Sequence, residues 1–467
     1  MTQHVQAPPI PAEAPRPLPL RIPWSLGSGT ILLGLNSAMI AVAVVPMAGD
    51  FGSSAAVAWI VSSLYIAAAV GSPTAGRLAD VFGARRVYLA GLALILVASL
   101  AGPFMPTAEW MIADRVVLGL GASAQFPAAM AIIRQQAAAR GSRPAGAIGI
   151  VAMCGQTTAA LGPTVGGFVV LLWGWPGIFW INLPMVALCA ALVLAFVPAD
   201  PRSERAGIAR RLASLDPLGM LLMVGALVLI MMGLLSADGG DAWWIFLGAG
   251  VPVLALFVWR EAVARTPFVD VRLMVAFPAF GMTLVRAVAT FVSFYCIFYG
   301  LPQWFQGEVG LDAGHTGLLM LPVFGVGAIS TWMASQLGAR VRPWALLTVG
   351  TAAMVVAGAG LALFTHADSP TWWFVVVCAL LGVPNGFNNL GNQLILNGAV
   401  PAHASGSATG VYRTAQYVGA ALAAIVVAHT IGAPGGSVAW LGWVIAGIGA
   451  VLLVTAIAAL ITTRRTA

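Results

Sequence analysis

Hydrophobic residues fill this chain in long runs, and short polar segments separate one run from the next. Between Ile22 and Gly76, for example, the only charged residue is Asp50. An α-helix needs about 20 apolar residues to cross a hydrocarbon core ~30 Å thick, and runs of that length recur along the whole sequence. The short alternation of apolar and polar positions that is typical of membrane-spanning strands is missing. The pattern therefore predicts an all-α integral membrane protein.

Fourteen apolar runs, bounded by charged or turn-rich breaks, are predicted to be membrane spans. They cover residues 25–48, 57–76, 87–105, 109–133, 146–172, 177–198, 215–236, 242–259, 277–301, 314–337, 343–365, 371–398, 405–430 and 437–461.

The positions of the arginines indicate which loops face the cytoplasm. With the N-terminus inside, the loops on that side hold Arg77, Arg85, Arg86, Arg134, Arg140, Arg143, Arg202, Arg205, Arg210, Arg211, Arg260, Arg265, Arg272, Arg340, Arg342, Arg464 and Arg465. The opposite loops hold acids instead, namely Asp50, Asp238, Asp241, Glu308, Asp312 and Asp368. Cytoplasmic loops of membrane proteins carry an excess of basic residues, so both termini are expected in the cytoplasm.

The spans group into two halves, an organisation that places a transporter's substrate site between the halves near mid-membrane. The predicted parts are a disordered Pro-rich cytoplasmic tail (1–23), a six-helix bundle (24–198), a cytoplasmic linker (199–214), two additional transmembrane helices (215–260), a cytoplasmic loop (261–276), a second six-helix bundle (277–461) and a short cytoplasmic tail (462–467). The first tail has no apolar segment of the kind found in a signal peptide.

The composition agrees with a membrane protein and excludes several other classes. The chain is 60% hydrophobic and 8% charged, whereas soluble domains are about a quarter charged. All 22 basic residues are arginines, so no ATP-binding loop with its lysine is present. Because the loop positions explain the net charge of +7, no nucleic-acid partner is expected. The isolated cysteines and scattered histidines indicate buried thiols and no metal site, so we expect no cofactor.

Several segments carry a resemblance to one family. The segment GRLADVFGARR (76–86) follows the pattern G-x-L-x-D-x-x-G-x-R-R and resembles the signature loop of the major facilitator superfamily. RVVLGLG (115–121) is similar to that family's arginine motif in span four, and LGPTVGG (161–167) resembles its antiporter motif. WGWPGIFWINLP (173–184), DPLG (216–219) and LPQWFQ (301–306) are similar to the fourteen-span drug:proton antiporter branch. The resemblance implies a multidrug efflux protein with a major-facilitator-type fold, in which two six-helix bundles flank two additional helices.

Two of these segments have a mechanical interpretation. In residues 76–86, which we call the latch loop, Gly76 allows close helix approach, Gly83 allows a tight turn and Asp80 can accept hydrogen bonds. The basic residues of the latch loop are Arg77, Arg85 and Arg86. In the antiporter motif, Pro163 bends the helix, and the resemblance implies that this bend limits leak. The glycines that let a neighbouring helix pack closely there are Gly162, Gly166 and Gly167.

Charged residues inside predicted spans are costly and are therefore candidate functional groups. Arg115 matches the family's arginine in span four, and the resemblance implies proton transfer and substrate contact; bonding to neighbouring carbonyl groups is the alternative. Asp114 is its predicted partner in proton coupling. Arg286 lies ~14 Å along span nine at ~1.5 Å per residue, so we expect it to face a wet cavity rather than to snorkel. Arg413 lies nearer a span end, where snorkelling or pairing with a loop is expected.

Amide side chains supply the other candidate cavity residues. Asn385, Asn388, Asn389 and Asn392 repeat at helical spacing in span twelve and form one polar stripe, which either lines the cavity or bonds to neighbouring helices. Gln125 and Gln156 are further candidates. Asn36 stands in span one where the antiporter branch usually has an acid, so cations are expected to be poor substrates.

These features favour a secondary exporter of drugs or small organic metabolites, driven by proton antiport and working by alternating access. The alternatives are an importer or uniporter of an anionic compound, a membrane-embedded enzyme, and a receptor or scaffold. An enzyme would need a clustered catalytic group, and none is visible, so no catalytic residue is assigned. We expect a monomer in the bacterial inner membrane whose partners are its substrate, protons and the lipid bilayer.

Overall fold

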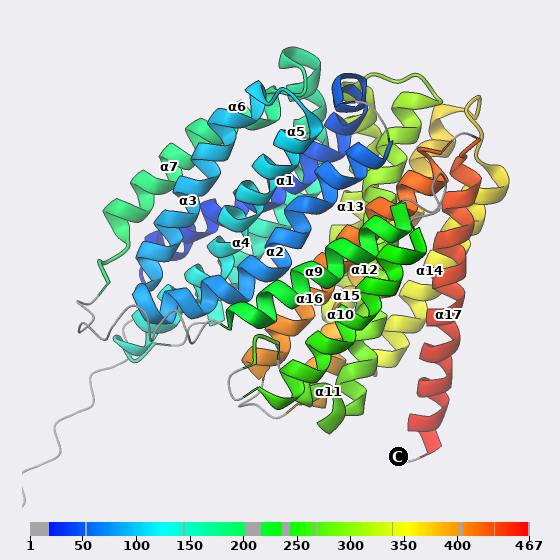
Figure 1. Ribbon diagram of the computed structural model, residues 1–467. Helices are drawn as coiled ribbons and strands as arrows, with labels where there is room; N and C mark the ends of the chain where they lie inside the picture. Colours follow the sequence, from blue (N-terminus) through cyan, green and yellow to red (C-terminus); the bar gives the residue numbers. More distant parts are fainter. Residues whose placement is uncertain are drawn as a thin grey trace, which may run out of the picture.

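The computed structural model describes residues 18–51, 54–142, 145–200, 216–235, 243–264, 267–269, 271–338, 340–400, 405–433 and 435–465. All regular structure in these ranges is helical (Figure 1). The helices of the first half are α1 (Arg21–Phe51), α2 (Ser54–Phe82), α3 (Ala84–Ala101), the 3₁₀ turn η1 (Gly102–Phe104), α4 (Ala108–Ala138), α5 (Ala145–Trp173), α6 (Gly177–Trp180) and α7 (Asn182–Phe196). They are followed by α9 (Pro217–Leu235), α10 (Trp243–Val263), α11 (Arg272–Ala276), α12 (Pro278–Gly307), α13 (Ala313–Gly338), α14 (Pro343–Phe364), α15 (Thr371–Ala399), α16 (Ser405–Thr430) and α17 (Val438–Arg465).

Thirteen helical segments of the described residues are long and apolar enough to cross a membrane. They correspond to the predicted spans, with the fifth as the exception. The fifth span falls on α5, which contains two shorter apolar stretches, Gly146–Gly155 and Leu161–Trp173. The chain is therefore an all-helical, multi-pass membrane protein. The Pro-rich tail and the linker 199–214 fall outside the described residues apart from residues 18–23, 199 and 200.

The prediction that residues 76–86 form a loop is wrong, because all of them except Gly83 are helical, but the turn expected at Gly83 is present. Helix α2 continues to Phe82 and α3 begins at Ala84, so Gly83 alone turns the chain. Gly83 has a φ of 101°, a backbone conformation that residues with a Cβ rarely adopt. The latch loop is therefore the junction of two helices, and its basic residues are held on helical backbone. The predicted loop 261–276 is shorter too, because α10 extends to Val263 and α11 occupies Arg272–Ala276.

The helices form two bundles, with α9 and α10 beside them (Figure 1). The two bundles contact each other mainly through α2 with α16, α5 with α13, and α1 with α12. Helices α9 and α10 pack on each other, and α9 contacts α2 and α16. The added pair therefore lies against one helix of each bundle.

Small residues let α5 pack closely against helices of both bundles. A Cβ on Gly162 would lie 2.1 Å from the Ala38 Cβ of α1, and a Cβ on Gly166 would lie 2.7 Å from the Met39 Cα. On another face, a Cβ on Gly167 would lie 2.3 Å from the Ala313 carbonyl oxygen of α13. Pro163 lies inside the same helix. Because no larger side chain fits at these glycines, α5 is a tightly packed element between α1 and α13.

The two ends of the bundle can be told apart by charge. We call the end at which α1, α3, α9, α12 and α14 begin the basic end, because Arg21, Arg85, Arg86, Arg260 and Arg342 lie there, at or next to helix termini. The opposite end, at which α1 and α12 finish, we call the acidic end, since Asp50, Glu308 and Asp312 lie there. This division provides the frame for the contacts described below.

Candidate functional site

Arg115 is a fully buried cation on α4 and is 0% exposed. The Nε, Nη1 and Nη2 atoms have no hydrogen-bond partner among the described residues. A buried guanidinium with unpaired donors costs several kcal/mol, so a partner is expected in some state of the protein.

Asp114, the predicted proton-coupling partner of Arg115, is also buried, at 6% exposed. Its Oδ2 atom has no hydrogen-bond partner within the described part of the chain, and neither a hydrogen bond nor an ion pair is found there between the two side chains. The two residues are neighbours in sequence but do not form a closed pair in this arrangement. Both therefore have atoms left to bind something else.

Four tyrosines from both bundles form a cluster, and two of them interact with Arg115. The Tyr65 hydroxyl of α2 is 2.8 Å from the Ser37 Oγ atom of α1, and it accepts a hydrogen bond from the Tyr299 hydroxyl of α12. The ring of Tyr65 also lies 5.3 Å from the Tyr295 ring and 6.5 Å from the Tyr417 ring, measured between centroids. Arg115 interacts electrostatically with Tyr65 and Tyr299. We call Tyr65, Tyr295, Tyr299 and Tyr417 the tyrosine cluster.

Sequence reasoning missed the tyrosine cluster, although a signal was available. The chain contains six tyrosines, and four of them form this cluster. Tyrosine in membrane proteins usually lies at the membrane interface. Positions 65, 295 and 417 fall well inside predicted spans, whereas 299 lies near the end of one, so the placement of the first three was unusual from the sequence alone.

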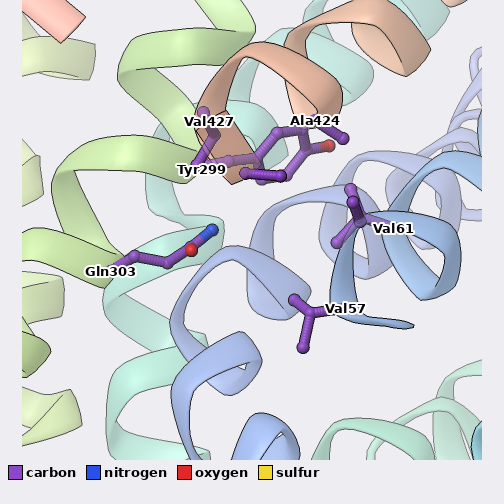
Figure 2. A pocket seen from close by; sticks show the side chains of 8 residues that line it. Val57, Val61, Tyr299, Gln303, Ala424 and Val427 are labelled. Carbon is purple, nitrogen blue, oxygen red and sulfur yellow. The ribbon is translucent and has the colours of Figure 1, made fainter. Parts of the chain in front are cut away.

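A small pocket lies beside the tyrosine cluster on the side of the acidic end (Figure 2). Tyr299 forms one wall, and Gln303 follows it one turn later on α12. The rest of the lining is apolar and comes from α2 and α16, with Val57 and Val61 facing Ala424 and Val427. The pocket is therefore built by both bundles, as is the tyrosine cluster.

Contacts between the bundles are found toward both ends. In the half nearer the acidic end, the Ser62 hydroxyl donates to the Ala421 carbonyl oxygen at 3.1 Å, and the Thr164 hydroxyl donates to that of Gly317 at 2.9 Å. In the half nearer the basic end, the Arg413 guanidinium lies 3.7 Å from the centre of the Phe126 ring. The expectation that Arg413 snorkels or pairs with a loop is therefore wrong, because the residue binds an aromatic ring of the opposite bundle.

Arg286, predicted to face a wet cavity, is surrounded by partners from its own bundle. Its Nε atom donates to the Asn392 Oδ1 atom at 2.8 Å, and its Nη2 atom donates to the Thr283 hydroxyl at 3.1 Å. The guanidinium also lies 4.7 Å from the centre of the Trp344 ring. Arg286 is 6% exposed. These contacts join α12, α14 and α15 within the second bundle.

The predicted asparagine stripe divides between different environments. Asn385 and Asn389 line a second small pocket between α12, α14 and α15, where the Asn389 Oδ1 atom accepts hydrogen bonds from Gln393 at 3.0 Å and from Tyr412 at 3.4 Å. Asn388 is fully buried against α14, and both atoms of its amide lack a partner among the described residues. A Cβ on Gly350 would lie 2.2 Å from the Asn388 Oδ1 atom, which shows how closely the two helices approach. The stripe thus lies inside the second bundle.

The other predicted amides tie helices of the first bundle together. Asn36 and Asn182 form a reciprocal pair of hydrogen bonds, 3.0 and 2.9 Å long. The Gln125 amide nitrogen donates to the carbonyl oxygens of Tyr88 and Gly121 at 3.3 and 3.1 Å. The side chain of Gln156 lies outside the described residues.

Asp200 binds the first turn of α3, next to the junction at Gly83. Its two carboxylate oxygens accept hydrogen bonds from the backbone nitrogens of Arg85 and Arg86 at 3.0 and 2.9 Å. An anion at these free N–H groups of the first turn of α3 also interacts favourably with the helix dipole. Asp200 was not among the predicted residues. The side chain of Asp80 lies outside the described residues, and Gly76 lies where a Cβ would be 3.8 Å from Pro127.

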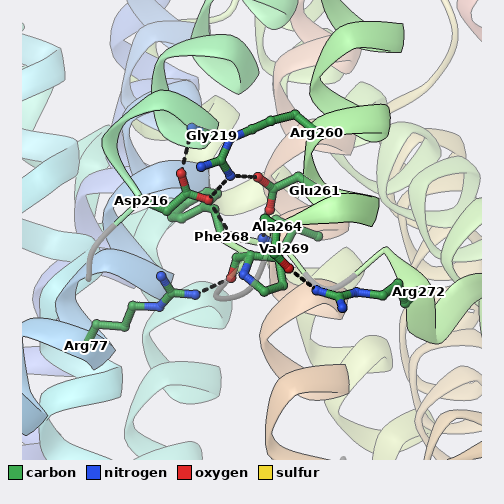
Figure 3. A network of polar contacts seen from close by, with 10 residues as sticks. Arg77, Asp216, Gly219, Arg260, Glu261, Ala264, Phe268, Val269 and Arg272 are labelled. Atoms are coloured by element: carbon green, nitrogen blue, oxygen red, sulfur yellow. Dashed lines mark hydrogen bonds and ion pairs between the residues drawn. The ribbon is translucent and has the colours of Figure 1, made fainter. Parts of the chain in front are cut away.

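A polar network at the basic end connects the latch loop to α9 and α10 (Figure 3). Arg77 donates a hydrogen bond to the Pro267 carbonyl oxygen. Asp216 accepts from the backbone nitrogen of Phe268 at 3.0 Å, and Glu261 accepts from that of Val269 at 2.6 Å. Arg260 bridges the two carboxylates, since it forms ion pairs with both Asp216 and Glu261. We call Asp216, Arg260 and Glu261 the carboxylate bridge.

The fold and these contacts define a class of protein. Two helical bundles meet around buried polar side chains, and they touch each other on both sides of those side chains. This is the architecture of a membrane transporter that binds its substrate between two halves. A family model described as Major Facilitator Superfamily matches residues 26–424, and the chain belongs to that superfamily.

Similar proteins agree with this assignment. The chain is 32% identical over 409 residues to the uncharacterized MFS-type transporter YwoD of Bacillus subtilis, with 87% of this chain and 89% of that protein covered. It is 30% identical over 424 residues to the tetracenomycin C resistance and export protein of Streptomyces glaucescens, with coverage of 87% and 75%. The structure of the xylose transporter XylE from E. coli, partially occluded and inward open, has a TM-score of 0.63 at 14% identity, with 93% and 97% covered, and shows the shared fold. The chain is a transporter and not an enzyme.

Proposed function

We propose that this protein is a secondary active exporter of drugs or small organic metabolites, which exchanges them for protons by alternating access. The observation that carries the proposal is Arg115, a fully buried cation whose three guanidinium nitrogens have no hydrogen-bond partner among the described residues. The export function of the tetracenomycin C relative supports the outward direction. The resemblance to the drug:proton antiporter branch supports proton coupling.

The proposed topology has fourteen spans, with α5 as the fifth. Helix α5 is 29 residues long, enough to cross a core of ~30 Å at ~1.5 Å per residue. The basic end then faces the cytoplasm of a bacterial inner membrane, as the positive-inside rule requires. The two six-helix bundles and the added pair α9–α10 are the proposed domains.

The proposed transport cycle opens one set of bundle contacts while the other set stays closed. Toward the acidic end, the closing contacts are the Ser62–Ala421 and Thr164–Gly317 hydrogen bonds. Toward the basic end, the Arg413–Phe126 contact joins the bundles. Because Arg115 is 0% exposed and interacts electrostatically with Tyr65 of the first bundle and Tyr299 of the second, we take it as the centre that the bundle movement exposes.

Asp114 and Arg115 are the proposed proton-coupling residues. Both keep polar atoms without partners in the described part of the chain. Protonation of Asp114 or binding of a substrate to Arg115 can therefore change the interaction between the two side chains. The network around Arg286 supports a positioning role for that residue within the second bundle. The latch loop and the close-packed glycines of α5 are proposed to restrain the bundle movement.

Transport in proteoliposomes with an imposed pH gradient tests the proposal. The panel contains cationic, neutral and anionic compounds, and each is measured with and without the gradient. Protein oriented with the basic end outside should accumulate at least one compound in the lumen, and a protonophore should abolish that accumulation. Movement that is independent of the pH gradient would contradict proton antiport.

A second candidate function is an importer or uniporter of an anionic small molecule, favoured by the unpaired donors of Arg115. It predicts downhill movement of an anion with no response to the protonophore. The same proteoliposome experiment separates the two functions.

A further inference from the structure

The tyrosine cluster lies near Arg115, which interacts electrostatically with Tyr65 of the first bundle and Tyr299 of the second. Ser37, Tyr65 and Arg115 come from α1, α2 and α4 of the first bundle, whereas Tyr295 and Tyr299 come from α12 of the second. The Tyr65–Tyr299 hydrogen bond crosses the boundary between the bundles. Separation of α2 from α12 therefore breaks this hydrogen bond and frees the two tyrosine hydroxyls near Arg115.

Arg115 offers hydrogen-bond donors that nothing in the described residues uses. All three guanidinium nitrogens of Arg115 are unpaired. A guanidinium presents its N–H groups in a planar fork that fits the two oxygens of a carboxylate. An anionic oxygen pair is therefore the ligand chemistry that best compensates the burial of this side chain.

The tyrosine cluster offers aromatic faces and edges. The rings of Tyr65 and Tyr295 meet edge to face at 5.3 Å, and those of Tyr295 and Tyr299 stack at 5.7 Å. Aromatic surfaces favour planar aromatic partners through offset stacking and edge-to-face contact. Since the rings come from both bundles, a planar molecule bound between them would contact both halves of the transporter.

We propose that this protein recognises planar aromatic compounds that carry an acidic oxygen group, with the oxygen group on Arg115 and the ring system among Tyr65, Tyr295 and Tyr299. This substrate class rests on the proposed transport function and adds to it the chemistry of the site. Asp114 interacts electrostatically with Arg115 but forms no hydrogen bond with it among the described residues, so the Arg115 nitrogens stay available to an anionic group. Tyr65 and Tyr299, once their mutual hydrogen bond is broken, supply further donors to the bound oxygen group.

Equilibrium binding to the purified protein in detergent tests the proposal with three radiolabelled probes. These are 2-naphthoate, its uncharged amide 2-naphthamide, and cyclohexanecarboxylate, which has the charge without the aromatic ring. Wild-type protein should bind 2-naphthoate at least about tenfold more tightly than either of the other two, which corresponds to about 1.4 kcal/mol. Equal affinity for naphthoate and naphthamide would show that Arg115 does not bind the acidic group. Equal affinity for the two carboxylates would show that the tyrosine rings do not bind the aromatic part.

Variants test whether Arg115 binds the acidic group and whether the tyrosines bind the ring system. Arg115→Gln should remove the preference for naphthoate over naphthamide, and Arg115→Lys should retain part of it. Tyr295→Leu should weaken both naphthyl compounds alike. Arg134→Gln is the matched control, because Arg134 lies on the same helix but is exposed, and it should leave all three affinities unchanged. Retention of the full preference by a folded Arg115→Gln protein would overturn the proposal.

The failure of this proposal can be told apart from failure of the transport function. If the proteoliposomes exchange protons for a cationic or neutral compound while naphthoate shows no binding preference, only the substrate class is wrong. If naphthoate binds with the expected preference but no compound of the panel moves, the transport mechanism is wrong and the binding site stands.

Discussion

Asn36 and Asn182 hold each other through a reciprocal pair of amide hydrogen bonds between α1 and α7. The Asn36 Nδ2 atom also donates to the Leu32 carbonyl oxygen at 2.8 Å, and the Asn182 amide donates to the Ser99 hydroxyl at 2.9 Å. Both side chains are buried. Asn36 therefore fills its donor and acceptor capacity inside the first bundle.

Replacement of Asn36 by aspartate should destabilise the protein without adding cation export. Asn36→Asp removes the two donors and sets a carboxylate against the Leu32 and Asn182 oxygens. A buried group left unsatisfied costs about 1–3 kcal/mol. Thermal unfolding in detergent, with Asn36→Ala, Asn182→Ala and the double variant, measures the coupling between the two side chains. Robust export of a quaternary cation by Asn36→Asp would show that the site reaches the substrate path after all.

This pair marks a limit of the sequence interpretation. The helical fold, thirteen of the spans and the family were predictable because they depend on local hydrophobicity and on contiguous motifs. The partner of Asn36 lies 146 residues away, and no spacing rule in one sequence brings these two positions together. Asp200 escaped prediction for the same reason, since only the folded chain brings it to the first turn of α3. For the tyrosines, the sequence shows that some lie inside spans but not that they meet one another.

Arg286→Ala should lower stability more than it lowers substrate affinity. The change removes hydrogen bonds to Asn392 and Thr283 and the contact with the Trp344 ring. Loss of charge-assisted bonds at a buried site costs about 1.5–3 kcal/mol each. Unfolding temperature and 2-naphthoate affinity should be measured on the same preparation, with Arg134→Gln as the exposed control. A tenfold loss of affinity at an unchanged unfolding temperature would instead assign Arg286 to the substrate cavity.

Gly83→Ala should impair both folding and transport. The residue has a φ of 101°, and a Cβ there would lie 2.4 Å from the Asp200 carboxylate. Strained backbone of this kind costs about 1–3 kcal/mol. Gly149→Ala on α5 is the control, because a Cβ at Gly149 meets nothing within 4 Å. Equal stability of the two variants would mean that the α2–α3 junction adapts at little cost.

Asp80→Asn should reduce transport while leaving membrane insertion and expression intact, because the substitution removes a charge and little volume. Asp200→Asn provides the comparison, since Asp200 caps α3 and its loss should lower stability by about 0.5–2 kcal/mol. Transport rates normalised to the amount of folded protein separate the two effects. If Asp80→Asn transports at the wild-type rate, the Asp80 carboxylate has no role in the transport mechanism.

Tyr65→Phe and Tyr299→Phe should each weaken the link between the bundles, and the double variant should lose no more than the stronger single variant. The two hydroxyls bond to each other, so removal of either one breaks the same interaction. A double-mutant cycle on the unfolding temperature measures the coupling, which for residues in contact is about 0.5–3 kcal/mol. Additive effects would show that the hydroxyls act independently.

Arg260→Gln should destabilise the attachment of α9 and α10 to the latch loop. Asp216 and Glu261 would then lie together as two buried carboxylates without their shared cation. Removing one partner of a buried ion pair typically costs about 3–5 kcal/mol, because the remaining charge is left uncompensated. The hydrogen bonds from Phe268 and Val269 to those carboxylates, and through them the position of Pro267, depend on the same bridge.

A double variant that removes one of the two carboxylates together with Arg260 tests whether charge balance causes the effect. In Arg260→Gln/Glu261→Gln the bridge region keeps one carboxylate fewer, so part of the lost stability should return. Limited proteolysis near residues 264–272 reports local detachment, and the global unfolding temperature is measured alongside it. If Arg260→Gln leaves cleavage unchanged, the carboxylate bridge does not hold the added helix pair against the latch loop. If cleavage rises in Arg260→Gln and falls again in the double variant, the balance of charge at Asp216 and Glu261 determines how firmly α9 and α10 are joined to α2.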